Sequence, residues 1–270
     1  MKIKLIKISI VLAVTFTSSV MSAEKTKLRI STHEMKPFHY MEDGKITGLY
    51  TDMIETVLKN IGVEYRINMY PMIREDQMLL NGEIDALYDA ADHGVKKGKL
   101  IIPEEQLLHT IWGMWVQKKD EHKLKFDSLE NLNGYRMGLV RGYMYAIWAN
   151  FRPHIEKHCD LRDVRNDTIN IVKLANDRLD YTVYEVLAGS IIAEEKGIAD
   201  KIVFLNDAAL NKYYPSNLMF SKRTMSGRRD LIRKFSMSLR EFKKTDQFRK
   251  LCIKYFKKEL PDVNVWGPPE

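Results

Sequence analysis

Residues Leu28–Gly62 read LRISTHEMKPFHYMEDGKITGLYTDMIETVLKNIG, and this stretch decides the fold of the chain. It begins with an apolar strand, expected at Leu28–Thr32, and continues through a loop of polar and aromatic residues. A helix follows, because apolar residues recur at helical spacing: Met53, Ile54, Val57, Leu58 and Ile61. Gly62 suits the C-cap of that helix, and Val63–Ile67 starts a second strand. The order predicts a βαβ unit in an α/β fold, with ligand-contacting side chains after its first strand.

Residues 1–23 have the features of a secretory signal. Lys2, Lys4 and Lys7 give it a basic start, and Ile8–Phe16 form an apolar core. An uncleaved membrane anchor is the alternative, but this core is too short to span a bilayer comfortably. We therefore expect an exported chain, with cleavage after Ala23 or after Ser22.

The charge balance argues against nucleic acid as a partner. The chain has 43 Lys and Arg against 36 Asp and Glu, a formal net charge of +7, and removal of the three signal lysines leaves +4. The basic residues are spread out except between Lys222 and Lys258, a segment that we interpret as a solvated helical face. Nucleic-acid binding requires a concentrated basic stripe, and export also argues against it.

Several short motifs resemble the family-3 extracellular solute-binding proteins, the periplasmic ligand-capturing partners of ABC importers. The opening stretch carries Pro37-Phe38, Gly48 and Asp52 in the family's order and spacing, and later matches are Gly82–Ala86, Gly142 and Asp180–Glu185. The resemblance implies a two-lobed α/β fold of the type II periplasmic-binding-protein class. It further implies a ligand cleft between the lobes and two crossing strands that act as a hinge.

The same resemblance divides the chain into lobes. Residues 24–113 and 213–270 are expected to form one lobe, and residues 114–212 the other, since long apolar strands stand near both boundaries. Cys159 and Cys252 then fall in different lobes, too far apart for a disulfide. We predict two free, buried thiols.

The ligand site is expected on loops of both lobes. Relatives have a carboxylate-gripping Arg where this chain has Lys97, and a Thr donor where it has Asp92. Glu185 stands where amino-acid binders hold an ammonium group with Asp, so Lys97 or Arg141 is left to take an anionic end. The complete candidate set is Met35, Phe38, Tyr70, Met72, Asp92 and Lys97 from the first lobe, with Arg141, Gly142, Tyr143 and Glu185 from the second.

Several of these residues have an alternative structural role. Phe38 and Met72 also suit an apolar core. Lys97 belongs to an exposed-looking basic run, and Arg141 suits a local cap or ion pair. Glu185 opens a helix, where a carboxylate is favourable without any ligand.

These features predict a monomeric periplasmic protein that captures a small polar ligand, amino-acid-like or amine-containing, and delivers it to an inner-membrane ABC permease. A sensory protein that reports to a membrane receptor is one alternative. A dehydratase-like enzyme using Glu34, Asp92 and Glu185 for acid–base work is another. The seven His and two Cys form no pattern typical of a metal site or a nucleophile, so we predict no cofactor, metal or catalytic residue.

Overall fold

The computed structural model describes residues 27–256 except for 89–97, 142, 144 and 146. The predicted signal, Asp92, Lys97 and Gly142 therefore lie outside the described residues. Within the described part, no helix is both long and apolar enough to cross a membrane.

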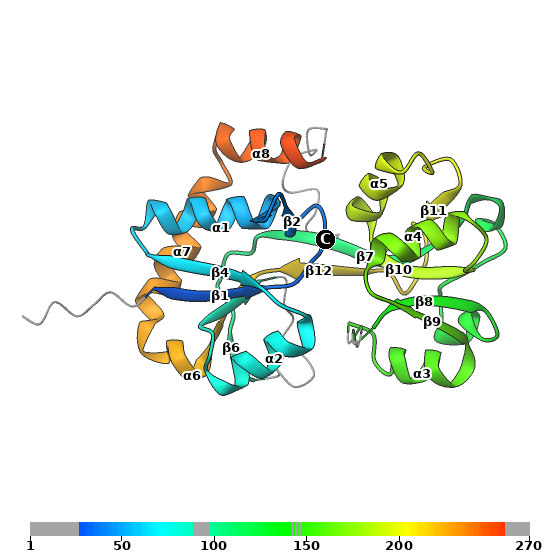
Figure 1. Cartoon of the computed structure of the whole chain (residues 1–270), viewed down its shortest axis with the longest axis horizontal. Helices are drawn as coiled ribbons and strands as arrows, with labels where there is room; N and C mark the ends of the chain where they lie inside the picture. The colour runs from blue at the N-terminus through cyan, green and yellow to red at the C-terminus, as the bar shows by residue number, and fades with distance from the viewer. Residues whose placement is uncertain (1–26, 89–97, 142, 144, 146, 257–270) are drawn as a thin grey trace, which may run out of the picture.

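Two separate sheets divide these residues into two lobes (Figure 1). Lobe 1 has a five-stranded sheet in the order β4 (Tyr65–Met69), β1 (Leu28–Thr32), β5 (Ala86–Tyr88), β13 (Leu218–Ser221) and β6 (Leu100–Ile101). The strand β1 runs parallel to both of its neighbours, whereas β13 is antiparallel to β5 and β6. The helices of this lobe are α1 (Leu49–Asn60), α2 (Met72–Asn81), α6 (Lys222–Met225), α7 (Arg229–Phe242) and α8 (Asp246–Phe256).

Lobe 2 has a second mixed sheet. Its order is β11 (Ile202–Phe204), β7 (Leu108–Gln117), β10 (Tyr181–Glu185), β8 (Arg136–Val140) and β9 (Asp160–Val164), with β12 (Lys212–Ser216) also paired to β7. Its α-helices are α3 (Phe151–His158), α4 (Asp167–Ala175) and α5 (Val186–Glu195). Short 3-10 helices lie at Lys118–Asp120, Leu129–Leu132 and Ser226–Arg228, and β2 (Tyr40–Glu42) pairs with β3 (Lys45–Thr47) as a hairpin.

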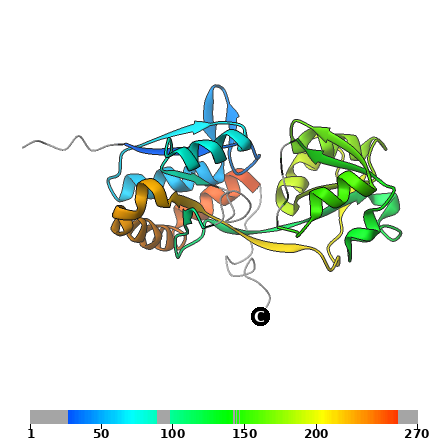
Figure 2. The same ribbon diagram turned by 90° about the horizontal axis from the view of Figure 1, so that it is seen from below.

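The chain passes between the lobes on the antiparallel strands β7 and β12, which run side by side in Figure 2. The sequence-based boundary at residues 113 and 114 falls inside β7, and the one at 212 and 213 falls at the start of β12. The returning segment is interrupted at Asn217, because β12 belongs to the second sheet and β13 to the first. Cys159 and Cys252 are both free, as predicted, but only Cys252 is buried, since Cys159 is partly exposed at the end of α3.

The opening βαβ unit forms as the apolar spacing predicts. Met53, Ile54 and Val57 of α1 are fully buried. Gly48 precedes the helix at φ 123°, and a Cβ atom there would lie 2.3 Å from the Phe38 carbonyl oxygen, so only glycine fits without rearrangement. Asp52 accepts a 2.6 Å hydrogen bond from the Tyr255 hydroxyl and ties α8 onto α1.

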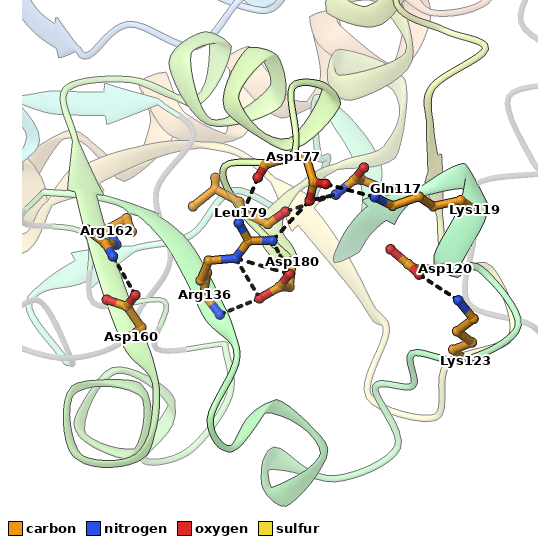
Figure 3. A network of polar contacts seen from close by, with 10 residues as sticks. All are labelled: Gln117, Lys119, Asp120, Lys123, Arg136, Asp160, Arg162, Asp177, Leu179 and Asp180. Carbon is orange, nitrogen blue, oxygen red and sulfur yellow. Dashed lines mark hydrogen bonds and ion pairs between the residues drawn. The ribbon is translucent and has the colours of Figure 1, made fainter.

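A polar network joins the starts of two strands and the end of a third in lobe 2 (Figure 3). The Arg136 guanidinium donates to Asp180 at 2.6 Å, and the Arg136 backbone N–H donates to the same carboxylate at 2.7 Å. Arg136 also donates to the Asp177 carbonyl at 2.7 Å, and Asp177 accepts from Gln117 at 2.9 Å. The network thus connects β8, β10 and β7.

We predict that Asp180→Ala lowers the free energy of unfolding by about 1–3 kcal/mol, because it removes a charged acceptor and leaves the half-buried Arg136 with fewer partners. Urea denaturation measures this loss. Asp160→Ala is the control, since Asp160 forms a pair with Arg162 in which both side chains are about half exposed, and it should cost less than about 1 kcal/mol. Equal losses for the two variants would contradict the structural role of the network.

Candidate functional site

The carboxyl ends of the parallel strands carry the polar residues that meet between the lobes. In lobe 1, His33 follows β1 and Tyr70 follows β4. In lobe 2, Arg141 follows β8, Asp167 follows β9 after a short turn, and Glu185 ends β10. Because these ends lie at one edge of each sheet, they form the natural walls of a ligand site.

Contacts between the two walls bring the lobes together. The ring of His33 in lobe 1 packs edge-on against Tyr143 in lobe 2, with 5.8 Å between ring centroids. The Tyr184 hydroxyl of β10 donates to the Lys36 carbonyl at 3.1 Å. Lys36 also forms a 2.9 Å ion pair with Glu195 at the end of α5. The described side chains therefore hold the lobes in contact beside the hinge.

A buried polar cluster forms the lobe 1 wall. His33 Nδ1 lies 2.9 Å from a carboxylate oxygen of Glu75, and the Ser31 hydroxyl donates to the other oxygen. His39 Nδ1 lies 2.6 Å from the His33 carbonyl and 3.0 Å from the Thr32 hydroxyl. All five side chains are at most 5% exposed. Such a dry, hydrogen-bonded cluster fixes the orientation of the His33 ring.

Glu185 is fully buried at the end of β10, where it caps α5. One of its carboxylate oxygens, Oε2, accepts a 2.7 Å hydrogen bond from the Ala188 backbone N–H. This is the helix-start role that the sequence also allowed.

Asp167, the first residue of α4, is a second buried carboxyl group in lobe 2. Asn166, not Asp167, caps the helix, because its side chain accepts from the Ile169 backbone N–H at 3.1 Å. Within the part of the chain that the structure describes, Asp167 Oδ1 has no hydrogen-bond partner. Burial raises the pKa of Asp167 to about 8, and the positive charge of His33 across the cleft opposes this shift. His33 thus interacts with carboxyl groups of both lobes, Glu75 and Asp167.

Two of the predicted first-lobe residues are part of the buried packing around the first loop. Phe38 is fully buried, stacks on Tyr50 with 4.6 Å between centroids, and meets Phe256 edge-on. Met35 is 4% exposed, and its backbone N–H donates to the His39 carbonyl at 2.7 Å. In this structure the role of Phe38 is packing, which follows from the aromatic residues that α1 and α8 place around it.

The other described candidates are less buried. Tyr70 is half-buried, with the Arg74 guanidinium 4.9 Å from its ring centroid, and Met72 is the half-buried first residue of α2. Arg141 is exposed, and its backbone N–H donates to Val164 at 2.8 Å. Tyr143 is half-buried and contacts His33 as described above.

The sequence analysis missed two buried acids. It named Glu34 as a carboxylate of the first loop, but Glu34 is exposed whereas Glu75 is buried. The available signal was the position of Glu75 one turn before the buried Leu79 on α2. Asp167 is not among the candidate site residues that the sequence suggested. No three His, Cys, Asp or Glu side chains among the described residues are placed to hold a metal ion.

Comparisons with known proteins agree with this architecture. The model of the family described as bacterial extracellular solute-binding proteins, family 3, matches residues 28–258. No curated protein matches the chain significantly.

Solved structures match closely in fold at low identity. A histidine kinase sensor domain with similarity to periplasmic binding proteins gives a TM-score of 0.69 at 16% identity, covering 87% of this chain and 98% of that one. The arginine-, lysine-, histidine-binding protein ArtJ from the thermophilic bacterium Geobacillus stearothermophilus gives 0.68 at 18% identity, covering 90% and 100%. An ancestral arginine-binding protein bound to arginine gives 0.65 at 18%, covering 85% and 98%. The predicted two-lobed periplasmic-binding-protein fold is confirmed.

The raised pKa of Asp167 makes the stability of the protein depend on pH. The folded state favours its neutral form, since its pKa of about 8 lies above the value of 3.8 expected on unfolding. The stability that this neutral carboxyl contributes is complete below pH 3.8 and declines as the pH rises toward 8. We expect wild type and Asp167→Asn to have similar melting temperatures at pH 5, and the variant to be the more stable at pH 8.5.

The comparison isolates Asp167 from the other titratable groups around it, His33, Glu75, Tyr143 and Tyr145, because both proteins contain them. Thermal unfolding at half-unit pH steps measures the two profiles. Parallel profiles from pH 5 to pH 8.5 would show that Asp167 is ionised in the folded protein.

Proposed function

Because the chain belongs to family 3 of the bacterial extracellular solute-binding proteins, we propose that it captures a small polar, amine-containing ligand in the periplasm by closing its two lobes. Delivery to an inner-membrane ABC permease completes the proposed function. We propose binding without catalysis. The observation that carries this proposal is the fully buried Glu185 carboxylate at the end of β10, next to Tyr184, whose hydroxyl contacts lobe 1.

The charges of the cleft suit a cationic ligand group. Glu75 in lobe 1 and Asp167 and Glu185 in lobe 2 are buried acids, each at most 6% exposed. A buried acid is stabilised by a positive partner, and a charge-assisted hydrogen bond contributes about 1.5–3 kcal/mol. An ammonium group that replaces water in this cleft therefore favours the closed arrangement of the lobes.

An anionic end of the ligand requires a basic partner, and Arg141 supports that role. It follows β8 directly, between the ends of β9 and β10 in the sheet order. It is exposed in this structure, so its guanidinium is available to a ligand that enters the cleft. Its fork can bind a carboxylate with two parallel hydrogen bonds. Lys97, the other candidate, stays a prediction from the sequence.

Lobe closure supplies the mechanism of capture. The two lobes are joined by β7 and β12, and contacts such as Tyr184 to Lys36 and His33 to Tyr143 form only when the lobes meet. A ligand that touches both walls adds its own contacts to these and shifts the population toward the closed state. A permease can then distinguish loaded from empty protein by shape.

The structural relatives support the ligand class. One of them is named as an arginine-binding protein and another as an arginine-, lysine-, histidine-binding protein. At 18% identity they support the fold directly and the ligand only by analogy. By that analogy, we propose that Glu185 of this chain binds the amine of the ligand.

A sensory role is the second candidate, and the sensor-domain neighbour is the observation that favours it. In that case the closed protein reports to a membrane receptor instead of a permease. Deletion of the gene distinguishes the two: loss of ligand uptake indicates transport, whereas loss of a ligand-induced transcriptional response with normal uptake indicates sensing.

We predict that Glu185→Gln weakens ligand binding by roughly tenfold or more, since it removes the negative charge that pairs with the amine. The amide oxygen of Gln can still accept from Ala188, so α5 should keep its cap and the protein should stay folded. A thermal-shift screen of amino acids, amines, dipeptides and sugars first identifies a ligand for wild type, and calorimetry then compares the variants.

The matched control is Glu34→Gln, which removes an exposed carboxylate from the first loop. It should leave the dissociation constant within about twofold, as a solvated charge contributes little. If Glu185→Gln binds as tightly as wild type, the proposed recognition of an amine is wrong and Glu185 serves only as a helix cap.

A further inference from the structure

Positive charge is concentrated in the last three helices of lobe 1. Residues 222–256 contain twelve Lys and Arg against three Asp and Glu. The rest of the chain holds 31 Lys and Arg against 33 Asp and Glu. The net charge of this protein therefore comes from α6, α7, α8 and their connections, which the ligand cleft does not use.

The outward side of α7 carries this charge around an exposed apolar side chain. Its inward side is formed by Ile232, Phe235, Leu239 and Phe242, which are buried. The opposite side is a stripe at helical spacing that continues just past the end of the helix. We call it the basic face, and its members are all exposed: Arg229, Arg233, Lys234, Met237 and Arg240 on α7, with Lys244 after it. Met237, at 60%, has the largest exposed fraction among the large apolar side chains that the structure describes.

A second exposed apolar residue borders the basic face. Ile102 is 48% exposed. It lines a shallow hollow of about 360 Å³ together with Pro103 and with Arg229 and Arg233 from α7. Exposed apolar and basic side chains thus lie together beside the start of α7.

The basic face lies away from the ligand cleft. In Figure 1, α7 is on the side of lobe 1 that is remote from lobe 2. Its buried side packs on α1 and on the core of lobe 1, so the helix is held rigidly while its outward side meets solvent. Occupation of this face does not require the lobes to open or close.

We propose that the basic face rests on an anionic lipid bilayer, with Met237 and Ile102 inserted among the headgroups. A helix that presents Lys and Arg with exposed apolar side chains fits the bilayer interface, where charge attracts it and apolar area holds it. An acidic protein surface would complement the basic side chains, but it would not explain the exposed Met237. The convex outer side of one helix also suits a flat layer of headgroups better than a groove.

The interaction is expected to be weak and dependent on salt. Each Lys or Arg close to an anionic membrane raises the membrane partition coefficient about fivefold. The attraction extends over about one Debye length, roughly 8 Å at physiological ionic strength. Three cations of the basic face are paired with acids, Arg233 with Asp230, Arg240 with Glu105 and Lys244 with Glu241. These acids reduce the net attraction, and so does Glu104, which lines the hollow beside the face. Reversible association is therefore expected, which leaves the protein free to diffuse between the bilayer and a membrane partner.

The test uses the chain without residues 1–23, so that the signal contributes nothing, and vesicles of phosphatidylcholine with or without phosphatidylglycerol. We expect co-sedimentation with the phosphatidylglycerol vesicles only, and less of it as salt increases. The double variant Arg233→Glu with Lys234→Glu should bind at least roughly tenfold more weakly. Met237→Ser should also weaken binding, without any change of charge.

Each variant has a matched control. Lys118→Glu with Lys123→Glu makes the same charge change on exposed residues of lobe 2, and Met41→Ser removes another exposed Met from the β2–β3 hairpin. Both controls should bind nearly as wild type does. The proposal is overturned if wild type ignores phosphatidylglycerol, or if the lobe 2 charge reversal weakens binding as much as the α7 reversal. It is equally overturned if Met237→Ser has no effect, since an acidic protein partner would then fit the face better.

Discussion

The antiparallel pairing of β7 with β12 is the constraint on which the two-lobed structure depends. Residues from Leu108 to Trp112 pair with residues from Ser216 to Lys212, and the far half of β7 pairs with β10 and β11 of the second sheet. One strand thus belongs to the hinge and to the lobe 2 core. Its hydrogen bonds fix where lobe 2 begins, and with it the positions of the strand ends that face lobe 1.

Burial affects the acidic groups of both lobes. Glu75, Asp167 and Glu185 have little or no access to water, and the same holds for the imidazole of His33. Such groups are costly unless each has a partner, so under the proposed function they would favour a positively charged or hydrogen-bond-donating ligand. His33 interacts with an acid of each lobe, Glu75 in lobe 1 and Asp167 in lobe 2. Arg141, which follows β8, is exposed and carries charge of the opposite sign.

The outer side of lobe 1 has a different character from the cleft. Most of its basic residues lie on or beside α7, whose inward side is mainly apolar, so their positions are fixed by the core while their charges remain solvated. The proposed ligand site would act on small molecules through a few buried groups. The proposed membrane contact of the basic face would act through many weak and screened interactions. The two surfaces are therefore separable by mutation.

The sequence by itself determined the α/β class, the opening βαβ unit and the family, because periodicity, glycine positions and motif spacing are local properties. It also placed Glu185 at the start of a helix and Arg141 after a strand. Only the tertiary structure showed that Glu75 pairs with His33 and that Asp167 meets His33 from the other lobe, since these residues are distant in the chain and only packing brings them together. Phe38 marks the same limit, because an aromatic residue after a strand suits a ligand wall and a core equally well. Its burial depends on Tyr50 and Phe256, the latter supplied by the last helix.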